Sequence, residues 1–196
     1  FNIAYCHFKE ADYDAAIKWF DIYLETGESS YRMVAAVRNA DCLFMQKKYA
    51  DAARAYSEVT ATYPNVNDIY PYYQSAVCYG LTGSNDKKIE ALDPIRKADP
   101  SSRYYSEALY ELGRAYVKAE NNGEAGRCFK TLIDYPVDST YYAKASIEMG
   151  MMCRNAGDYD AALTWYRQVV EKMPLSLCTD DALAAIESIF EAKSET

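Results

Sequence analysis

Small residues recur along this chain at almost constant intervals, and this rhythm limits the fold more than any other feature. The column consists of Ala4, Ala40, Ala76, Gly113 and Gly150, with successive intervals of 36, 36, 37 and 37 residues. Two helices approach each other closely only where a small side chain lies between them. The rhythm therefore predicts helical hairpins stacked in sequence, each with an apolar face that its neighbour covers.

Three further columns keep the same intervals. The first consists of Tyr13, Tyr49, Asn85, Asn122 and Tyr159. The second holds the bulky apolar residues Phe20, Tyr56, Leu92, Phe129 and Tyr166. The third consists of Ala16, Ala52, Ala125 and Ala162, with Lys88 as the exception. Bulky residues in fixed register with small ones indicate one packing contact repeated in every hairpin.

Composition supports an all-α chain. With 8 Gly and 6 Pro among 196 residues, turn formers are too few for many short strands. The formal net charge is -8 and no basic patch is visible, which argues against nucleic acid as a partner. No apolar run approaches the roughly 20 residues that span a bilayer, so we expect no direct membrane insertion. The chain begins within a helical pattern, FNIAYCHF, and we expect it to be a fragment of a longer protein.

Turn and cap residues set the limits of the repeats within a single domain over 1–196. The predicted repeats are 1–28, truncated at its start, 31–64, 68–100, 102–136 and 139–174. In the last repeat, Ser139 and Asp158 are expected N-caps and Gly157 a left-handed stop, which places helices near 140–155 and 159–172. Pro94 predicts a kink or an early break near 90–94. Residues 179–193 predict another amphipathic helix, which either caps the stack or opens a sixth repeat.

The cysteines and the single histidine fall in packing columns. Cys6, Cys42 and Cys78 share one column and are expected to be buried, about 10 Å apart, which is too far for a disulfide. His7 falls in a column of bulky residues and is expected to be a packed ring. No CxxC or Gly-rich phosphate loop is present. We therefore expect no catalytic residue, no metal site and no cofactor.

Other polar and aromatic groups also have structural explanations. The acidic pairs Asp12/Asp14, Asp158/Asp160 and Asp180/Asp181 begin predicted helices, where carboxylates cap backbone amides. Trp19 and Trp165 share a column, which favours packing. Tyrosine pairs at 72/73, 104/105 and 141/142 begin first helices. One member of each pair should pack between hairpins while the other stays partly exposed.

The segments ELGRAY (111–116) and GDYDAALTWYRQVVEKMP (157–174) resemble the tetratricopeptide repeat family. The period is two or three residues longer than the usual 34. Segments such as LIDYPVDSTYYAKASIEMG (132–150) are similar to the long-period repeats of bacterial envelope proteins. The resemblance implies a right-handed α-α superhelix of about five hairpins plus a C-terminal capping helix. It also implies a non-enzymatic scaffold for a protein or peptide partner.

The cellular compartment stays open, because unpaired cysteines favour a reducing interior while the resemblance favours the envelope.

By the same resemblance, the first helices would line a concave, protein-binding face. The expected residues are Tyr5, Phe8, Val37, Asp41, Phe44, Met45, Tyr73, Val77, Leu81, Tyr110, Arg114, Val117, Ile147, Met151 and Arg154. An aromatic and aliphatic groove suits an apolar helix or an extended segment. In some family members a Lys/Asn/Arg clamp binds a terminal carboxylate, but only Arg38 fits that pattern here.

Three alternatives remain open from the residues alone. Neighbouring repeats or another helix could fill the groove. Uncapped ends could stack on another copy to give a homo-oligomer. The repeats could also form a sensor or regulatory module within a larger multidomain protein.

Overall fold

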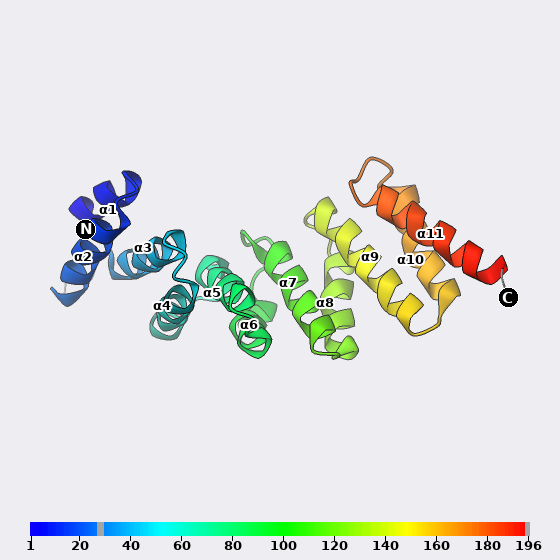
Figure 1. Cartoon of the computed structure of the whole chain (residues 1–196), viewed down its shortest axis with the longest axis horizontal. Coiled ribbons are helices and arrows are strands. Elements are labelled where there is room, and N and C mark those ends of the chain that lie inside the picture. Colours follow the sequence, from blue (N-terminus) through cyan, green and yellow to red (C-terminus); the bar gives the residue numbers. More distant parts are fainter. Residues whose placement is uncertain (27–29, 195–196) are drawn as a thin grey trace. The chain divides into compact units, whose positions relative to one another are not determined.

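The computed structural model describes residues 1–26 and 30–194, and the chain is all-α within them. Contacts group the chain into an N-terminal unit, Phe1–Tyr105, and a C-terminal unit, Ser106–Thr196. In each unit helices pack in sequence as hairpins, as expected for a tetratricopeptide superhelix (Figure 1). The single domain over 1–196 stays a prediction, and the end of the first predicted repeat at residue 28 lies outside the described residues.

The helices of the N-terminal unit are α1 (Asn2–Lys9), α2 (Tyr13–Glu25), α3 (Arg32–Met45), α4 (Tyr49–Thr62), α5 (Ile69–Leu81), α6 (Asn85–Leu92) and the 3-10 helix η1 (Asp93–Lys97). The following helices are α7 (Tyr105–Lys118), α8 (Asn122–Asp134), α9 (Ser139–Asn155), α10 (Tyr159–Lys172) and α11 (Thr179–Ser194). In each hairpin, the second helix begins at the residue of the column that starts with Tyr13, because the same turn precedes all five of these helices.

The small and bulky columns meet inside the hairpins. The bulky side chains from Phe20 to Tyr166 are all essentially inaccessible to solvent. A methyl group added to Gly113 on α7 would lie 2.5 Å from Cε1 of Phe129 on α8. One added to Gly150 on α9 would lie 2.5 Å from Cε1 of Tyr166 on α10. Ring-on-glycine contact therefore explains why the column admits only small residues.

The core extends from hairpin to hairpin within each unit. In the N-terminal unit, Ala35 and Cys42 of α3 pack with Phe20 of α2, and Cys78 of α5 packs with Tyr56 of α4. In the C-terminal unit, α11 packs onto α10 through buried side chains that include Ile189. Helices α3, α5 and α11 thus each bury one side against the preceding hairpin, as the stacked architecture requires.

The five hairpin turns share one backbone geometry. Each contains a residue with φ between 56° and 82°, namely Ala11, Lys47, Gly83, Glu120 and Gly157. The N–H of the following residue donates to the carbonyl five residues back, as from Asp158 to Cys153 at 3.0 Å. This bond satisfies a carbonyl at the end of the first helix. The left-handed stop predicted at Gly157 is confirmed.

Two further local predictions have different outcomes. Helix α6 ends at Leu92 and gives way to η1, which contains Pro94, so the predicted break is confirmed. The expected cap at Ser139 is wrong by one residue, because the side chain of Asp138 accepts the N–H of Thr140 and Ser139 is already helical. Asp158 caps α10 as predicted and accepts the N–H of Ala161 at 3.0 Å.

All six cysteines are free thiols. Cys42 and Cys78 are fully buried as predicted, but Cys6 is exposed. The two buried thiols contact the preceding hairpin, whereas the described residues place no hairpin before α1.

Trp19, with 38% of its surface exposed, also departs from the predicted packing. His7 is half-buried, with Nδ1 3.7 Å from Oδ2 of Asp12.

The tyrosine pairs follow the prediction. Tyr72, Tyr105 and Tyr142 are buried. Their partners Tyr73, Tyr104 and Tyr141 are half-exposed. Each pair therefore has one buried ring and one partly exposed ring.

Candidate protein-binding cleft

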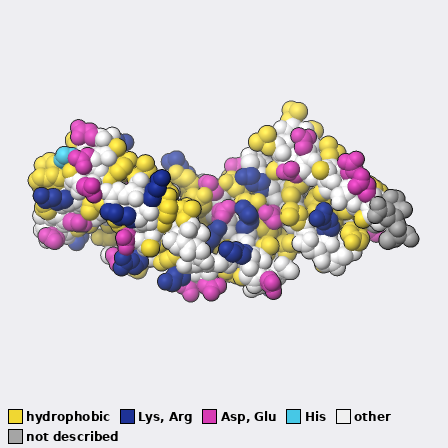
Figure 2. Space-filling model, in the orientation of Figure 1, with side chains coloured by type: hydrophobic (Ala, Val, Ile, Leu, Met, Phe, Trp, Pro, Cys, Tyr) yellow, Lys and Arg dark blue, Asp and Glu magenta, His cyan; other side chains and the backbone are white. Residues whose placement is uncertain are grey.

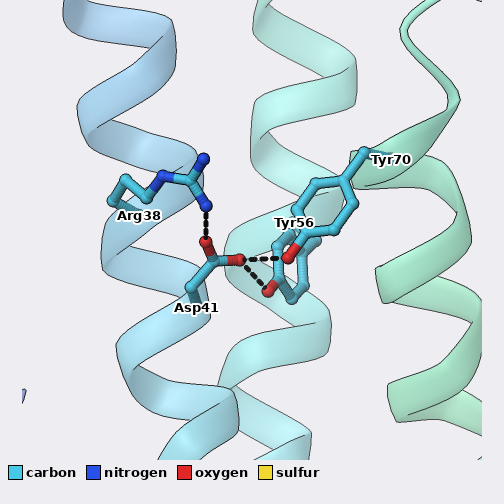
Figure 3. Close-up of polar contacts among 4 residues, drawn as sticks. All are labelled: Arg38, Asp41, Tyr56 and Tyr70. Atoms are coloured by element: carbon cyan, nitrogen blue, oxygen red, sulfur yellow. Dashed lines mark hydrogen bonds and ion pairs between the residues drawn. The ribbon is translucent and has the colours of Figure 1, made fainter. Parts of the chain in front are cut away.

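Three polar side chains from three successive helices meet around the carboxylate of Asp41 (Figure 3). Arg38 and Asp41 lie on α3, one turn apart, and Arg38 Nη1 donates to Asp41 Oδ2 at 2.5 Å. Tyr56 Oη on α4 and Tyr70 Oη on α5 both donate to Asp41 Oδ1, at 2.5 Å and 2.9 Å. Asp41 is only 5% exposed. The carboxylate therefore links the second hairpin to the first helix of the third.

The cluster holds its phenols in the protonated form. Burial, followed by the charge of Asp41, raises the pKa of both Tyr56 and Tyr70 well above the ordinary value of 10.0. Burial acts to lower the pKa of Arg38, but the hydrogen bond and charge of Asp41 outweigh it, so the guanidinium stays charged. Both phenols therefore stay un-ionised near neutral pH. The cluster positions Arg38 and Tyr70.

These two residues form part of a cleft of about 500 Å³, which we call the α3–α5 cleft. Its lining consists of Met33, Val34, Val37 and Arg38 from α3, Asn67 and Asp68 from the α4–α5 loop, Ile69, Tyr70 and Pro71 from α5, and Arg103 and Tyr104 before α7. The Oδ1 of Asn67 accepts the backbone N–H of Asp99 at 2.8 Å, which ties the two loops together. The cleft thus joins apolar side chains to two guanidinium groups.

Stacked tyrosines form one wall of this cleft. The ring of Tyr104 lies parallel to that of Tyr73, with an interplanar angle of 8° and centroids 5.9 Å apart. It also contacts the ring of Tyr70, 5.7 Å away. The guanidinium of Arg103 lies 4.8 Å from the centre of the Tyr104 ring, within cation–π range. The stack therefore carries Arg103 at the edge of the cleft.

The predicted concave residues of the N-terminal unit divide into buried and accessible groups. Val37 and Asp41 are 8% and 5% exposed, which corrects their placement on an open face. Val37 packs in the core of the second hairpin, and Asp41 is held by three donors. Tyr5, Phe8, Phe44, Tyr73 and Val77 are half-buried. Met45 and Leu81, at the ends of α3 and α5, are 53% and 56% exposed.

In the C-terminal unit, the polar members of the set contact each other. Tyr110 Oη donates to Glu148 Oε1 at 3.0 Å, and Arg114 Nε lies 3.7 Å from the same oxygen. Arg114 therefore has an internal partner. Val117 and Ile147 are half-buried, and Met151 and Arg154 are exposed. Whether these residues bind a partner stays a prediction.

Sequence reasoning missed most of the cleft lining. Of the predicted residues only Val37 lines the cleft, which lies at the N-terminal ends of α3 and α5, whereas Phe44, Met45, Val77 and Leu81 lie toward the C-terminal ends of these helices. Met33 and Val34 could have been found by extending the same helix face one turn toward the N-terminus. Arg103 and Tyr104 lie between repeats, where no column continues.

Figure 2 shows the distribution of charged side chains on one face of the molecule. On the face shown in Figure 2, basic and acidic side chains are interspersed among hydrophobic ones. Within residues 1–26 and 30–194, no helix is both long and apolar enough to cross a bilayer. Over that same part of the chain, no three His, Cys, Asp or Glu side chains gather as a metal-binding group.

Comparison with known proteins yields two family matches. Two profiles described as tetratricopeptide repeat match residues 37–65 and 110–176. A search of curated protein sequences gives no significant match.

Solved structures with the same fold are numerous. MamA is 17% identical, with a TM-score of 0.66 over 87% of this chain and 94% of MamA. A tetratricopeptide repeat protein from Parabacteroides merdae is 16% identical, with a TM-score of 0.67 over 96% of this chain and 76% of that one. YrrB, described as a protein of this type with an unusual peptide-binding site, is 16% identical. Its TM-score is 0.69 over 95% of this chain and 89% of YrrB. At these identities the likeness concerns the fold alone.

Proposed function

The chain is a tetratricopeptide repeat protein, and from this premise we propose that it is a non-enzymatic scaffold that holds a segment of another protein against its first helices. Proteins of this family generally mediate protein–protein interactions and are typically not enzymes. The peptide-binding site described for YrrB supports the same kind of role.

The observation that carries the proposal is the apolar surface along α3 and α5. It comprises the α3–α5 cleft, the half-buried side chains of Phe44 and Tyr73, and the exposed side chains of Met45 and Leu81 at the C-terminal ends of α3 and α5. Exposed apolar and aromatic side chains on a rigid surface are typical of protein recognition sites. An extended or helical segment could cover this surface without unfolding any part of the chain.

A random peptide library displayed on phage tests this function. Peptides selected on the wild-type chain should bind a Met45→Glu, Leu81→Glu variant about tenfold more weakly, a loss of about 1.4 kcal/mol. Leu175→Glu is the matched control, because Leu175 is 99% exposed and lies outside α3 and α5. Equal binding to the double variant and the control would exclude this surface as the binding site.

Self-assembly is a second candidate, favoured by exposed apolar residues on the first and last helices. Ile3 on α1 is 54% exposed, and Leu183 and Phe190 on α11 are 48% and 50% exposed. Stacking of one copy on another would cover such faces. Analytical ultracentrifugation should then show concentration-dependent mass that Leu183→Glu with Phe190→Glu abolishes. A constant monomer mass at high concentration would rule this candidate out.

A further inference from the structure

The α3–α5 cleft contains positive charge that the described residues do not neutralise. Arg103 is exposed, and no carboxylate of the described chain lies within ion-pair distance of it. Arg38 uses Nη1 for Asp41, while its buried Nε has no hydrogen-bond partner among the described residues. Asp41 lies behind Arg38 and already accepts from three donors. An incoming group would therefore meet one free guanidinium and one that is only partly engaged.

The backbone that carries Arg103 is strained. Tyr104 has a φ of 70°, a left-handed conformation that costs a bulky residue about 1–2 kcal/mol. Unlike the five left-handed residues of the hairpin turns, it lies outside the repeating geometry. Stacking on the ring of Tyr73 and contact with the tilted ring of Tyr70 hold it in place. Strain that its surroundings maintain in a cleft is typical of a binding site.

The other residues of the cleft lining indicate which groups of a bound segment would lie beside its charged side chain. Met33 and Val34 on α3 offer an apolar floor beside Arg38. Asp68 is the surface carboxylate of the lining, half-buried and without a side-chain hydrogen bond at the start of α5. It can accept a backbone N–H from an extended segment. Because Arg38 is already paired with Asp41, Arg103 is the guanidinium of the lining that has no ion-pair partner among the described residues.

We propose that the α3–α5 cleft binds an acidic side chain of an extended segment in a protein partner. This inference rests on the proposed scaffold function. The carboxylate lies between Arg38 and Arg103, because guanidinium groups pair with carboxylates through two parallel hydrogen bonds. A neighbouring apolar side chain of the segment packs on Met33 and Val34. Tyr104 and the Asp41 cluster act as positioning residues for the two guanidiniums.

The test begins with the peptides selected from the phage library on the wild-type chain. They should be enriched in Asp or Glu next to an apolar residue. Synthetic versions, acetylated and amidated at their ends, are then measured by fluorescence anisotropy. Glu→Gln in the peptide should weaken binding to the wild-type chain about tenfold, as loss of a charge-assisted hydrogen bond does. In Arg103→Gln the same peptide change should have no further effect, because the pairing group is gone.

The controls separate this proposal from the broader function. Arg127→Gln on α8 removes an exposed arginine paired with Glu124 and should leave the affinity unchanged. Arg103→Lys should recover only part of the affinity, since it keeps charge without the two-pronged geometry. Circular dichroism verifies that each variant is folded.

Each outcome of the library experiment bears on a different claim. Two results would overturn the acidic-side-chain proposal and leave the scaffold function intact. One is a set of selected peptides with no enrichment in Asp or Glu. The other is that Arg103→Gln and the peptide change Glu→Gln have additive effects on the binding free energy. Binding that disappears on amidation of the peptide would assign the cleft to a terminal carboxylate, which also overturns it. Failure to select any peptide would count against both proposals.

Discussion

At the residue scale, contact between a glycine and a ring determines which side chains the hairpins admit. The rings of Phe129 and Tyr166 occupy the volume where a side chain at Gly113 or Gly150 would lie. Both rings are fully buried and cannot swing out into solvent. The sequence columns predicted this contact, because each one repeats a local requirement for size.

Gly150→Ala should therefore destabilise the chain by about 1–3 kcal/mol, the usual cost of overpacking a core. Gly126→Ala is the matched control, since Gly126 is also in a helix and an added methyl would lie 3.9 Å from Cε of Met152. It should stabilise by about 0.5–1 kcal/mol, because alanine is the better helix former. Urea unfolding of both variants gives the comparison. Equal effects would show that the ring contact does not limit residue size.

The Asp41 cluster, in contrast, could not be predicted from the columns. Position 41 corresponds to Val77, Arg114 and Met151 in later repeats, so no repeated requirement marks it as a buried acceptor. Its partners come from three helices, and only the fold brings them together. A residue that occurs once in a repeat protein therefore needs the structure for its role to be recognised.

Asp41→Asn should cost about 1–3 kcal/mol, because the amide presents donor hydrogens to groups that are themselves donors. Asp51→Asn is the control. Asp51 forms an ion pair with Arg54 on the surface of α4, and its side chain is 49% exposed. Such pairs contribute about 0–1 kcal/mol. Thermal unfolding monitored by circular dichroism measures both, and a similar loss for the two would contradict a central role for the cluster.

At the scale of the elements, the hairpin turn is more uniform than its sequence. Five turns use a left-handed residue at the same point, yet only Gly83 and Gly157 are glycines. Ala11, Lys47 and Glu120 adopt the same conformation without the residue that favours it. The sequence analysis predicted the left-handed residue only at Gly157, where a helix cap follows it, and the position of the other turns followed from the period.

Lys47→Gly and Glu120→Gly should each stabilise the chain by about 0.5–1 kcal/mol. The left-handed conformation costs an L-residue about 1–2 kcal/mol, and the extra flexibility of glycine in the unfolded chain offsets part of the gain. Gly157→Ala should shift the free energy of unfolding by about 1 kcal/mol in the opposite direction. Chemical denaturation provides the measurement. If glycine destabilised both turns, the Lys47 and Glu120 side chains would have to make contacts that outweigh the strain.

At the scale of the whole molecule, the sequence predicted the fold well and the candidate site poorly. The reason is that the packing contacts of the fold repeat along the chain, whereas the residues of the site do not. Packing within each hairpin repeats, so Ala40, Ala76 and Gly150 mark the same contact independently. Binding depends on departures from the repeat, such as Arg103 and Tyr104 in a loop between hairpins. Even Pro94, the irregularity that was predicted correctly, is visible only because proline has a local geometric effect.

Burial of many weakly acidic groups makes the stability of the whole chain sensitive to alkaline pH. Burial raises the pKa of the Cys42 thiol to about 12 and that of Cys78 to about 11, from an ordinary value of 9.0. Below about pH 9 these thiols are protonated in both the folded and the unfolded chain, and their contribution to stability is constant. Above it the unfolded chain loses protons first, so the free energy of unfolding falls as the pH rises toward the folded-state values.

Replacing both thiols should flatten this pH dependence. Ala115 occupies the same column, so Cys42→Ala with Cys78→Ala keeps a residue type that the stack already accommodates. Urea unfolding between about pH 8 and about pH 11 should show a smaller loss of stability for this variant than for the wild-type chain. A residual decline should remain, because the raised pKa of Tyr56 and Tyr70 links the same equilibrium to phenol ionisation. Identical slopes would mean that the thiols ionise without unfolding, and that the hairpin interfaces open locally while the stack stays intact.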